Sequence, residues 1–299
     1  HFIMKIRKDK FMALENKEQP KKEENKKKTK WADKLINRKV DGEKKTKTEK
    51  TLTIITWASI FILWYVITKL EVFSPTLLPG PFRVWKAFLH ILENGYNKVP
   101  IWVHLGASLK RLFVALFFAI FSAVPLGLLS GYFSKVEAVI DSVIEFYRPL
   151  PPLAYYTLLV LWFGIDDLSK QVLLFLAAFA PIYIACVSAV RKLNRDFVLS
   201  AESLGADQKD VFFKIVLPAS MPEIFTGIRT AFGVAYTTLV SAEMVAATSG
   251  IGWMVLDASN FLKSEVIFVG IIIMGITGVI IDAGFRYLEE NIIFWKGHV

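Results

Sequence analysis

Six apolar segments constrain this chain more than any other feature, because each is close to the length that a helix needs to cross a bilayer. They cover residues 51–68, 112–131, 144–163, 171–190, 223–248 and 266–287. A transmembrane helix takes about 20 residues, and in lipid every backbone polar group must bond within the protein. None of the segments shows the alternation of a membrane β-barrel. With 54% hydrophobic residues, the chain is predicted to be an all-α integral membrane protein with six transmembrane helices.

The positive charge of the chain is concentrated at one end. Residues 1–50 hold 18 Lys and Arg against nine Asp and Glu, and so carry the whole net charge of +9. Their lack of apolar periodicity indicates a disordered, Lys-rich cytoplasmic tail, residues 1–50, before a transmembrane domain, residues 51–299. The tail either anchors the chain to anionic lipid or only fixes its topology. It has neither interleaved aromatic residues nor a folded reader, so nucleic-acid binding is not expected.

The distribution of Lys and Arg predicts which side each loop faces. With the tail in the cytoplasm, the inner segments hold Lys135, Arg191, Lys192, Arg195, Lys209, Lys214 and Lys296. The outer segments hold Lys69, Arg83, Lys86, Lys98, Lys170 and Lys263. Lys110 and Arg111, at the outer mouth of the second span, run against the rule. We therefore expect both termini and the loop 196–218 to be cytoplasmic, mainly from the tail and from that loop.

Two smaller features concern packing. The outer connection 71–104 contains an amphipathic pattern with Trp85 and Phe88, which predicts a helix that lies either on the outer leaflet or against the bundle. The only cysteine, Cys186, lies in an apolar run and is expected to be buried. One cysteine forms neither an internal disulfide nor a metal site.

The loop 196–218 has the pattern of an amphipathic helix between two spans. Its apolar residues recur at helical spacing, at Phe197, Ala201, Leu204, Val211 and Ile215. Asp210 and Lys214 have the i,i+4 spacing of an ion pair. Pro218 is expected to end the helix, because the residue before a proline avoids helical geometry. A polar helix hung between spans indicates a docking surface for a cytoplasmic partner.

Ionisable residues inside apolar segments are costly and are candidates for function. Glu243 lies in the middle of VSAEMVAAT, and we expect it either to line a translocation path or to tie helices together by hydrogen bonds. Glu145 and Arg148 lie three residues apart and either form an ion pair on one helix face or contribute to the path.

The run YRPLPPLAYYTLLVLWFG combines prolines with aromatic residues. Pro149, Pro151 and Pro152 free backbone carbonyls, which membrane proteins tolerate within protein or beside a water-filled cavity. Tyr155, Tyr156 and Trp162 are candidates for contact with a small organic solute. An interfacial aromatic belt on a kinked span is the alternative.

Several motifs are missing. The sequence has no GxxxxGK[ST] phosphate loop, so it predicts no ATP site of that type. It also has no HExxH, GxSxG or Cys/His cluster, so we predict no catalytic or metal-binding residue. The energy for any transport is expected to come from another subunit.

The loop 196–218 resembles the coupling motif of permease subunits of ATP-binding-cassette (ABC) importers, which reads Glu-Ala-Ala, three residues, Gly, nine residues, Ile, one residue, Leu-Pro. Gly205, Ile215, Leu217 and Pro218 match this spacing, and Ala201 matches the second Ala. Leu199 stands where the motif has Glu. The resemblance implies contact with an ATPase through Ala201, Leu204, Gly205, Ala206, Val211, Ile215, Leu217 and Pro218.

From about residue 51 onward the chain resembles the permeases for taurine, alkanesulfonates, nitrate and bicarbonate, and most of all the taurine permease subunits. The stretches EFYRPLPPLA, SMPEIFTGIR and VSAEMVAAT carry this likeness. It implies the type I ABC-importer permease fold, a bacterial inner-membrane location, a homodimer of permeases and an external solute-binding protein. A cytoplasmic ATPase dimer would bind ATP and Mg.

The resemblance leaves the solute open. Taurine or another aliphatic sulfonate is the first expectation, with nitrate, bicarbonate or a heterocyclic solute as alternatives. A self-sufficient secondary transporter would predict an internal repeat, which the sequence does not show. A membrane anchor without transport would not explain Glu243 and Arg148 within apolar segments.

Overall fold

The computed structural model describes residues 47–293 and residue 295. The predicted tail lies outside the described residues except at its end, where residues 47–50 begin a helix. Packing divides the chain into two compact units, residues 1–63 and residues 64–299. In its described part, the first unit is the greater part of one helix, α2 (Lys47–Lys69).

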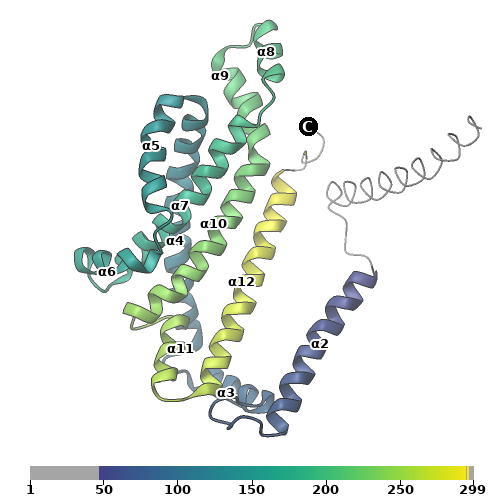
Figure 1. Cartoon of the computed structure of the whole chain (residues 1–299), viewed down its shortest axis with the longest axis vertical. Helices are drawn as coiled ribbons and strands as arrows, with labels where there is room; N and C mark the ends of the chain where they lie inside the picture. The colour runs from purple at the N-terminus through teal and green to yellow at the C-terminus, as the bar shows by residue number, and fades with distance from the viewer. Residues whose placement is uncertain (1–46, 294, 296–299) are drawn as a thin grey trace, which may run out of the picture. The chain divides into compact units, whose positions relative to one another are not determined.

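The second unit is helical (Figure 1). It contains α3 (Pro81–Asn94), α4 (Ile101–Tyr132), α5 (Ser134–Tyr147), α6 (Pro152–Phe163), α7 (Asp167–Arg191), α8 (Arg195–Ser203), α9 (Gln208–Val211), the π-helical turn η1 (Phe212–Val216), α10 (Leu217–Ala246), α11 (Ile251–Asn260) and α12 (Ser264–Ile292). An isolated β-bridge joins Tyr96 and Val99. The predicted all-α class is confirmed.

Helix α7 forms the centre of the second unit, because it packs against both α4 and α10. The core between these three helices includes Leu112, Tyr183 and Leu239. Two glycines permit the close approach. A Cβ at Gly127 of α4 would lie 2.6 Å from the Cβ of Cys186, and one at Gly227 of α10 would lie 2.3 Å from the Cβ of Ala185. Cys186 is buried, as expected.

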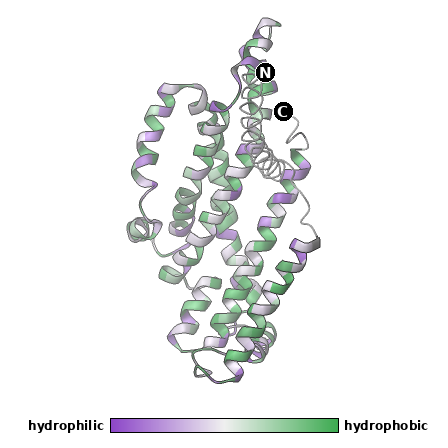
Figure 2. Cartoon of the chain, turned by 45° about the vertical axis from the view of Figure 1, so that its right-hand side comes forward, coloured by the Kyte–Doolittle hydropathy of each residue, from purple (hydrophilic) through white to green (hydrophobic). Residues whose placement is uncertain are grey.

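Within the described residues, five helical stretches are long and apolar enough to cross a membrane. They are residues 48–69, α4, α7, the continuous stretch 208–246 and α12. The long helices of the second unit are coloured largely as hydrophobic in Figure 2. Hydrophobic side chains remain exposed along α4 and α12, as expected of helices that face a membrane. Examples are Phe117, Phe121, Ile276 and Val279.

The third predicted span, 144–163, is not one helix. The chain leaves α5 after Tyr147 and enters α6 at Pro152, so the segment is divided at Pro149 and Pro151. These prolines supply no backbone N–H and clash with the preceding turn, so they break the helix. Helix α6 is apolar but has only 12 residues. The broken segment turns α6 against α7 and α10.

The loop 196–218 also differs from its prediction. It is not one helix with a single apolar face, because α8 ends at Ser203 and α9 begins at Gln208. Pro218 does not end the element. Leu217 has helical φ and ψ of −62° and −51°, and Pro218 is accommodated within the first two positions of α10. Pro218 removes one backbone donor, but the chain stays in helical geometry because η1 runs directly into α10.

The second unit has two contrasting ends (Figure 1). Helices α8 and α9 extend beyond one end of α10, whereas α3 and α11 lie at the other. Helix α3 buries Val84 and Ile91 and packs against α12. Of the two placements expected for the outer helix, the structure therefore has the one against the bundle. Trp85 points outward and is exposed.

Candidate functional site

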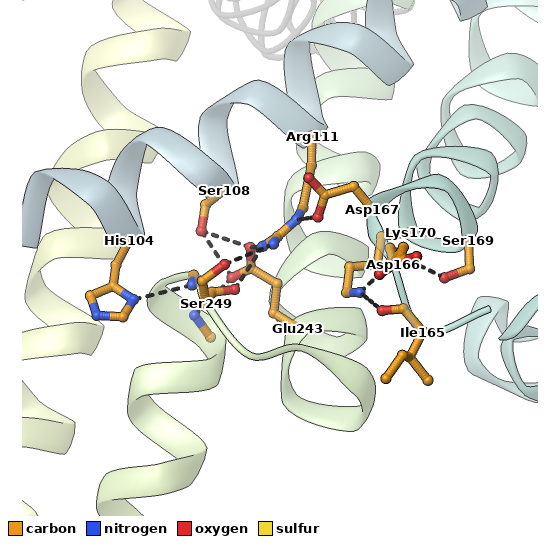
Figure 3. A network of polar contacts seen from close by, with 12 residues as sticks. His104, Ser108, Arg111, Ile165, Asp166, Asp167, Ser169, Lys170, Glu243 and Ser249 are labelled. Carbon is orange, nitrogen blue, oxygen red and sulfur yellow. Dashed lines mark hydrogen bonds and ion pairs between the residues drawn. The ribbon is translucent and has the colours of Figure 1, made fainter. Parts of the chain in front are cut away.

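A buried polar network joins α4, α7, α10 and the turn before α11 (Figure 3). At its centre are Arg111 of α4 and Glu243 of α10, which are only 3% and 1% exposed. Nη1 of Arg111 lies 2.6 Å from Oε1 of Glu243. Oγ of Ser108, one helical turn before Arg111, donates to the same carboxylate at 2.7 Å. A carboxylate is stable at such depth because a cation and further donors surround it.

The turn between α10 and α11 is bound into this network. Gly252 N–H donates to Oε2 of Glu243 at 2.9 Å, and Ile251 N–H donates to Oγ of Ser108 at 3.0 Å. Gly250 has φ of +125°, and a Cβ there would lie 2.4 Å from the Glu243 carboxylate carbon. Only glycine combines this backbone conformation with so close an approach.

Arg111 also reaches the start of α7. Its Nε lies 2.6 Å from Oδ1 of Asp167, in the first turn of that helix. Nη1 donates to the carbonyl of Ser249 at 2.8 Å and Nη2 to the hydroxyl of Ser249 at 3.1 Å. One guanidinium therefore binds a carboxylate on α10, a carboxylate on α7 and the loop between α10 and α11.

Lys170 of α7 lies beside the polar network and is also buried. It is 1% exposed, and its Nζ donates to the carbonyls of Ile165 and Asp166 at 2.6 and 3.0 Å. The ammonium fixes the turn that leads from α6 into α7 (Figure 3). A lysine predicted as an outer-loop charge is thus part of the folded core.

The network explains why Arg111 does not follow the distribution of Lys and Arg expected for a membrane protein: it is part of the folded interior and not of a loop. Arg111 was expected at the outer mouth of the second span and Glu243 in the middle of the fifth, yet the two side chains are ion-pair partners. Glu243 ties helices together in this conformation, which was one of its two predicted roles. Ser108, one turn before Arg111 and with a hydroxyl for the same carboxylate, was the signal that could have directed attention to this face of α4.

A cavity of about 540 Å³ lies between the α5–α6 connection, α7 and α10. Its polar lining consists of Tyr147, Arg148, Tyr155, Ser188, Glu223, Thr226 and Thr230. On α7 the lining runs from Leu176 to Ser188. At 1.5 Å per residue, these two residues lie about 14 and 32 Å from the start of α7, which is about 38 Å long. The cavity therefore lies beside the middle and the C-terminal half of α7, and it is open, because Arg148, Thr226 and Thr230 in its lining are exposed. Its volume is typical of a small-molecule site.

The predicted pathway residues fall into three groups. Arg148 and Tyr155 line the cavity. Tyr156 is buried in a separate apolar cluster with Leu159, Leu173 and Ala242. Glu145 and Trp162 are exposed and do not line the cavity. In the described part of the chain, no ion pair joins Glu145 to Arg148, so this predicted pairing is wrong for this conformation.

The loop between α7 and α10 has a defined turn at Gly205. Ala206 N–H donates to the carbonyl of Ala201 at 3.0 Å and Gly205 N–H to that of Glu202 at 2.9 Å. This pair of bonds, with φ of +85° at Gly205, is a Schellman C-cap, which favours glycine. A Cβ at Gly205 would meet open space.

The residues predicted to contact a partner differ in exposure. Leu204 is 89% exposed, whereas Val211 is buried. Phe213, which was not among the predicted contacts, is also exposed. Ala201, Ala206, Ile215, Leu217 and Pro218 are partly buried. Nζ of Lys214 lies 2.8 Å from Oδ1 of Asp210, so the predicted i,i+4 ion pair is confirmed.

A second polar contact lies at the α3–α11 end. The hydroxyl of Tyr96 donates to Oδ2 of Asp257 at 2.7 Å, and Nδ2 of Asn97 donates to the same oxygen at 3.1 Å. Burial, and then the adjacent carboxylate, raise the pKa of Tyr96 above its usual value. The phenol therefore stays protonated and fastens the α3–α4 connection to α11. Among the described residues, no group of three or more His, Cys, Asp or Glu is placed to hold a metal ion.

Comparisons with known proteins agree along most of the chain. Residues 123–293 match the family described as binding-protein-dependent transport system inner membrane component. The taurine transport system permease protein TauC of Escherichia coli is 38% identical over 268 residues, which are 89% of this chain and 98% of that protein. The putative aliphatic sulfonates transport permease protein SsuC of Bacillus subtilis is 33% identical, over 80% of this chain and 85% of that protein. The nitrate import permease protein NrtB of Synechocystis is 26% identical, over 79% and 86% respectively.

Proposed function

Because the chain belongs to the family of binding-protein-dependent transport system inner membrane components, we propose that it is the permease subunit of an importer for taurine or another aliphatic sulfonate. The observation that carries this proposal is the 38% identity to a taurine permease over 89% of the chain. The aligned length is great enough to include the membrane-spanning helices, the loop at Gly205 and the cavity. Relatives named for aliphatic sulfonates and for nitrate give the alternative solutes.

Coupling to ATP takes place through the segment from α8 to η1. The exposed side chains of Leu204 and Phe213 provide an apolar contact for a groove in an ATPase subunit. The turn at Gly205 has open space beside its Cα, which permits a close backbone approach. The ATPase, as a dimer, binds ATP and Mg, and this chain supplies the surface that receives the movement. Leu199 at the position of the motif Glu leaves this contact mainly apolar.

The complete importer contains two copies of this permease, the ATPase dimer and an external solute-binding protein. The segment α8–η1 faces the cytoplasm together with both chain termini, and the α3–α11 end faces the binding protein. Five membrane-crossing stretches in the described residues and the short helix α6 are compatible with this orientation. The Lys and Arg residues near α8 and α9 support it.

Transport follows from differential binding to two states. The loaded binding protein and the ATP-bound ATPase dimer both bind the outward-open permease more tightly than the inward-open one, so together they shift the population outward. After hydrolysis the permease returns to the inward-open state and releases the solute. The solute passes along the cavity that Arg148 and Tyr155 line.

The test is ATP hydrolysis by the reconstituted permease and ATPase. We expect taurine-loaded binding protein to stimulate hydrolysis and empty binding protein to stimulate it much less. Stimulation by a binding protein loaded with nitrate or bicarbonate instead would change the solute but keep the class. If the permease did not assemble with any ATPase, the proposed function would be wrong.

The variant Gly205→Trp tests the coupling surface. It should abolish uptake while the protein still folds and enters the membrane, since the added ring projects into open space in the isolated chain. Uptake at the level of the unmodified protein would remove the coupling role of this turn. Gly164→Trp, at the end of α6, is the matched control, because Gly164 also has a positive φ, +81°, and a Cβ there also meets open space.

A further inference from the structure

We infer that the cavity between the α5–α6 connection, α7 and α10 is a binding site for a short zwitterion, in which Arg148 holds the acidic group and Glu223 with its neighbouring hydroxyls holds the ammonium group. The inference rests on the proposed function, because it assigns solute recognition to the same pathway. It goes further, since it gives this chain a selectivity of its own.

Arg148 is the cation of the site. Its backbone N–H donates to the carbonyl of Ile144 at 2.9 Å, so it closes the last turn of α5. Pro149 and Pro151 follow and restrict the backbone beyond it. The base of the side chain is therefore held in place where the chain turns into α6, at the wall of the cavity.

The Arg148 guanidinium has no protein partner among the residues that the structure describes. Other arginines in the bundle do have one. Arg111 holds Glu243 and Asp167, and Nε of Arg229 lies 2.6 Å from Oδ1 of Asp282. Five N–H donors of Arg148 thus remain available to a ligand in the cavity. A planar guanidinium binds the oxygens of a carboxylate, phosphate or sulfonate in pairs, which makes an anionic group its natural ligand.

The wall formed by α10 offers acceptors instead. Oε1 of Glu223 accepts from Nζ of Lys192 at 2.7 Å, which leaves Oε2 available. The hydroxyls of Thr226 and Thr230 donate to the carbonyls of Pro222 and Thr226, both at 2.9 Å. Their hydrogens are therefore engaged, and the oxygens present lone pairs. A carboxylate beside two hydroxyl oxygens favours a ligand with N–H donors, such as an ammonium group.

Two further hydroxyls lie between these walls. Neither the hydroxyl of Tyr155 nor that of Ser188 has a hydrogen-bond partner in the described part of the protein, and both residues line the cavity. Each can donate to or accept from a solute. The apolar remainder of the lining, including Leu176 and Ile184, suits a short hydrocarbon spacer. An ω-amino sulfonate or ω-amino carboxylate has these three parts in this order.

The site is built for weak binding. Glu223 is already paired and 42% exposed at its side chain, so its attraction for an ammonium is screened. A transport site must bind strongly enough to admit the solute and weakly enough to release it. The charges therefore select the solute without trapping it.

The experiment measures binding and transport on the same complexes. Radiolabelled taurine is added to the nucleotide-free permease–ATPase complex, without binding protein, and its binding is measured by scintillation proximity with ethanesulfonate as a competitor. Taurine uptake per ATP hydrolysed is measured in proteoliposomes with loaded binding protein.

We expect Arg148→Gln to weaken taurine binding about tenfold or more, as loss of a charged hydrogen bond does, and to lower uptake per ATP. Arg148→Lys should recover part of both, and Lys110→Gln, an equal charge change at an exposed site of α4, should have no effect.

Glu223→Gln separates the two ends of the ligand. It should weaken taurine binding several-fold and leave the inhibition constant of ethanesulfonate unchanged, because ethanesulfonate has no ammonium group. Glu290→Gln, at an exposed position near the end of α12, is the matched control.

The outcomes distinguish this inference from the proposed function. If loaded binding protein stimulates ATP hydrolysis but the complex binds no taurine, or if Arg148→Gln binds it as the unmodified protein does, the zwitterion site is wrong and the importer assignment stands. If taurine-loaded binding protein produces no stimulation at all, the proposed function itself fails. Equal weakening of ethanesulfonate and taurine by Glu223→Gln would overturn the role of Glu223.

Discussion

Two arginine–carboxylate sites in this protein use the same chemistry in opposite ways. Arg111 and Glu243 are buried and bonded to each other, and their neighbours supply the remaining hydrogen bonds. Arg148 and Glu223 line an open cavity without a bond between them. Both carboxylates belong to α10 and lie about 30 Å apart along it, at 1.5 Å per residue. The difference shows that the hydrogen-bonding state of a charge within the bundle, rather than its presence there, separates a structural role from a role in binding.

The physical reason is the cost of an unsatisfied charge. In a dry interior, a charge must have partners in the resting protein, and every hydrogen bond given to a solute would be taken from the fold. Beside a cavity, water satisfies the group until a solute replaces it. The closed network is therefore suited to holding helices, and the open pair is suited to exchanging ligands.

The largest expected effect comes from breaking the closed network at one side. Arg111→Met leaves the Glu243 carboxylate buried without its cation and should lower the free energy of unfolding by about 3–5 kcal/mol. The measurement is thermal or denaturant unfolding of the purified protein in detergent. The double variant with Glu243→Gln should recover part of the loss, because no uncompensated charge then remains. Equal stability of the single variant and the unmodified protein would contradict a structural role for this pair.

A somewhat smaller effect is expected at the turn that covers the network. Gly250→Ala forces a left-handed backbone conformation and places a methyl group against the Glu243 carboxylate, so it should cost about 3 kcal/mol. Gly205→Ala has a similar strain in φ but open space for its Cβ, and should cost only about 1–2 kcal/mol. Thermal unfolding of both variants measures the difference. A larger loss for Gly205→Ala would show that the close approach at Gly250 has little energetic weight.

The open site should give a much smaller change in stability. Glu223→Gln removes an exposed ion pair with Lys192, which contributes about 0–1 kcal/mol. Glu243→Gln, the same chemical change in the closed network, should cost clearly more. Parallel unfolding of the two variants sharpens the comparison, and similar losses would mean that the cavity is less open than its lining indicates.

The smallest effect is expected in the loop between α7 and α10. Asp210→Asn removes the i,i+4 ion pair with Lys214, which stabilises a helix by about 0.2–0.5 kcal/mol. Unfolding at low and high salt should show a difference between variant and unmodified protein that shrinks as salt rises. A loss of more than 1 kcal/mol would indicate that this pair has further contacts.

The sequence predicted those features that depend on neighbouring residues. The long apolar stretches, the buried Cys186 and the Asp210–Lys214 pair all follow from local composition and spacing, and the structure has each of them. The partner of Glu243 did not follow, because Arg111 is 132 residues away in the chain. In the sequence, Arg111 stands next to another basic residue, Lys110, and the two together resemble the charges of a loop. The structure separates them, because Lys110 is exposed and Arg111 is buried.

Proline produced two of the errors in helix boundaries. Pro149 and Pro151 divide a segment that is apolar enough to be read as one span. Pro218 does the reverse and lies in a helix that continues past it, since η1 provides the preceding turn. A proline removes one donor in either case. Pro125, Pro181 and Pro222 also lie inside unbroken helices, so whether a helix breaks at a proline depends on the packing around it.

The continuity of the stretch from Gln208 to Ala246 has a mechanical consequence. Its 39 residues form a single shaft about 58 Å long, at 1.5 Å per residue. Glu223 and Glu243 are fixed on this shaft 20 residues apart, so a torque applied near α9 turns both carboxylates together unless the helix deforms between them. The π-helical turn at Phe212–Val216 lies on the α9 side of both. If that turn deforms, it does so before either carboxylate is reached, and Glu223 and Glu243 still rotate together.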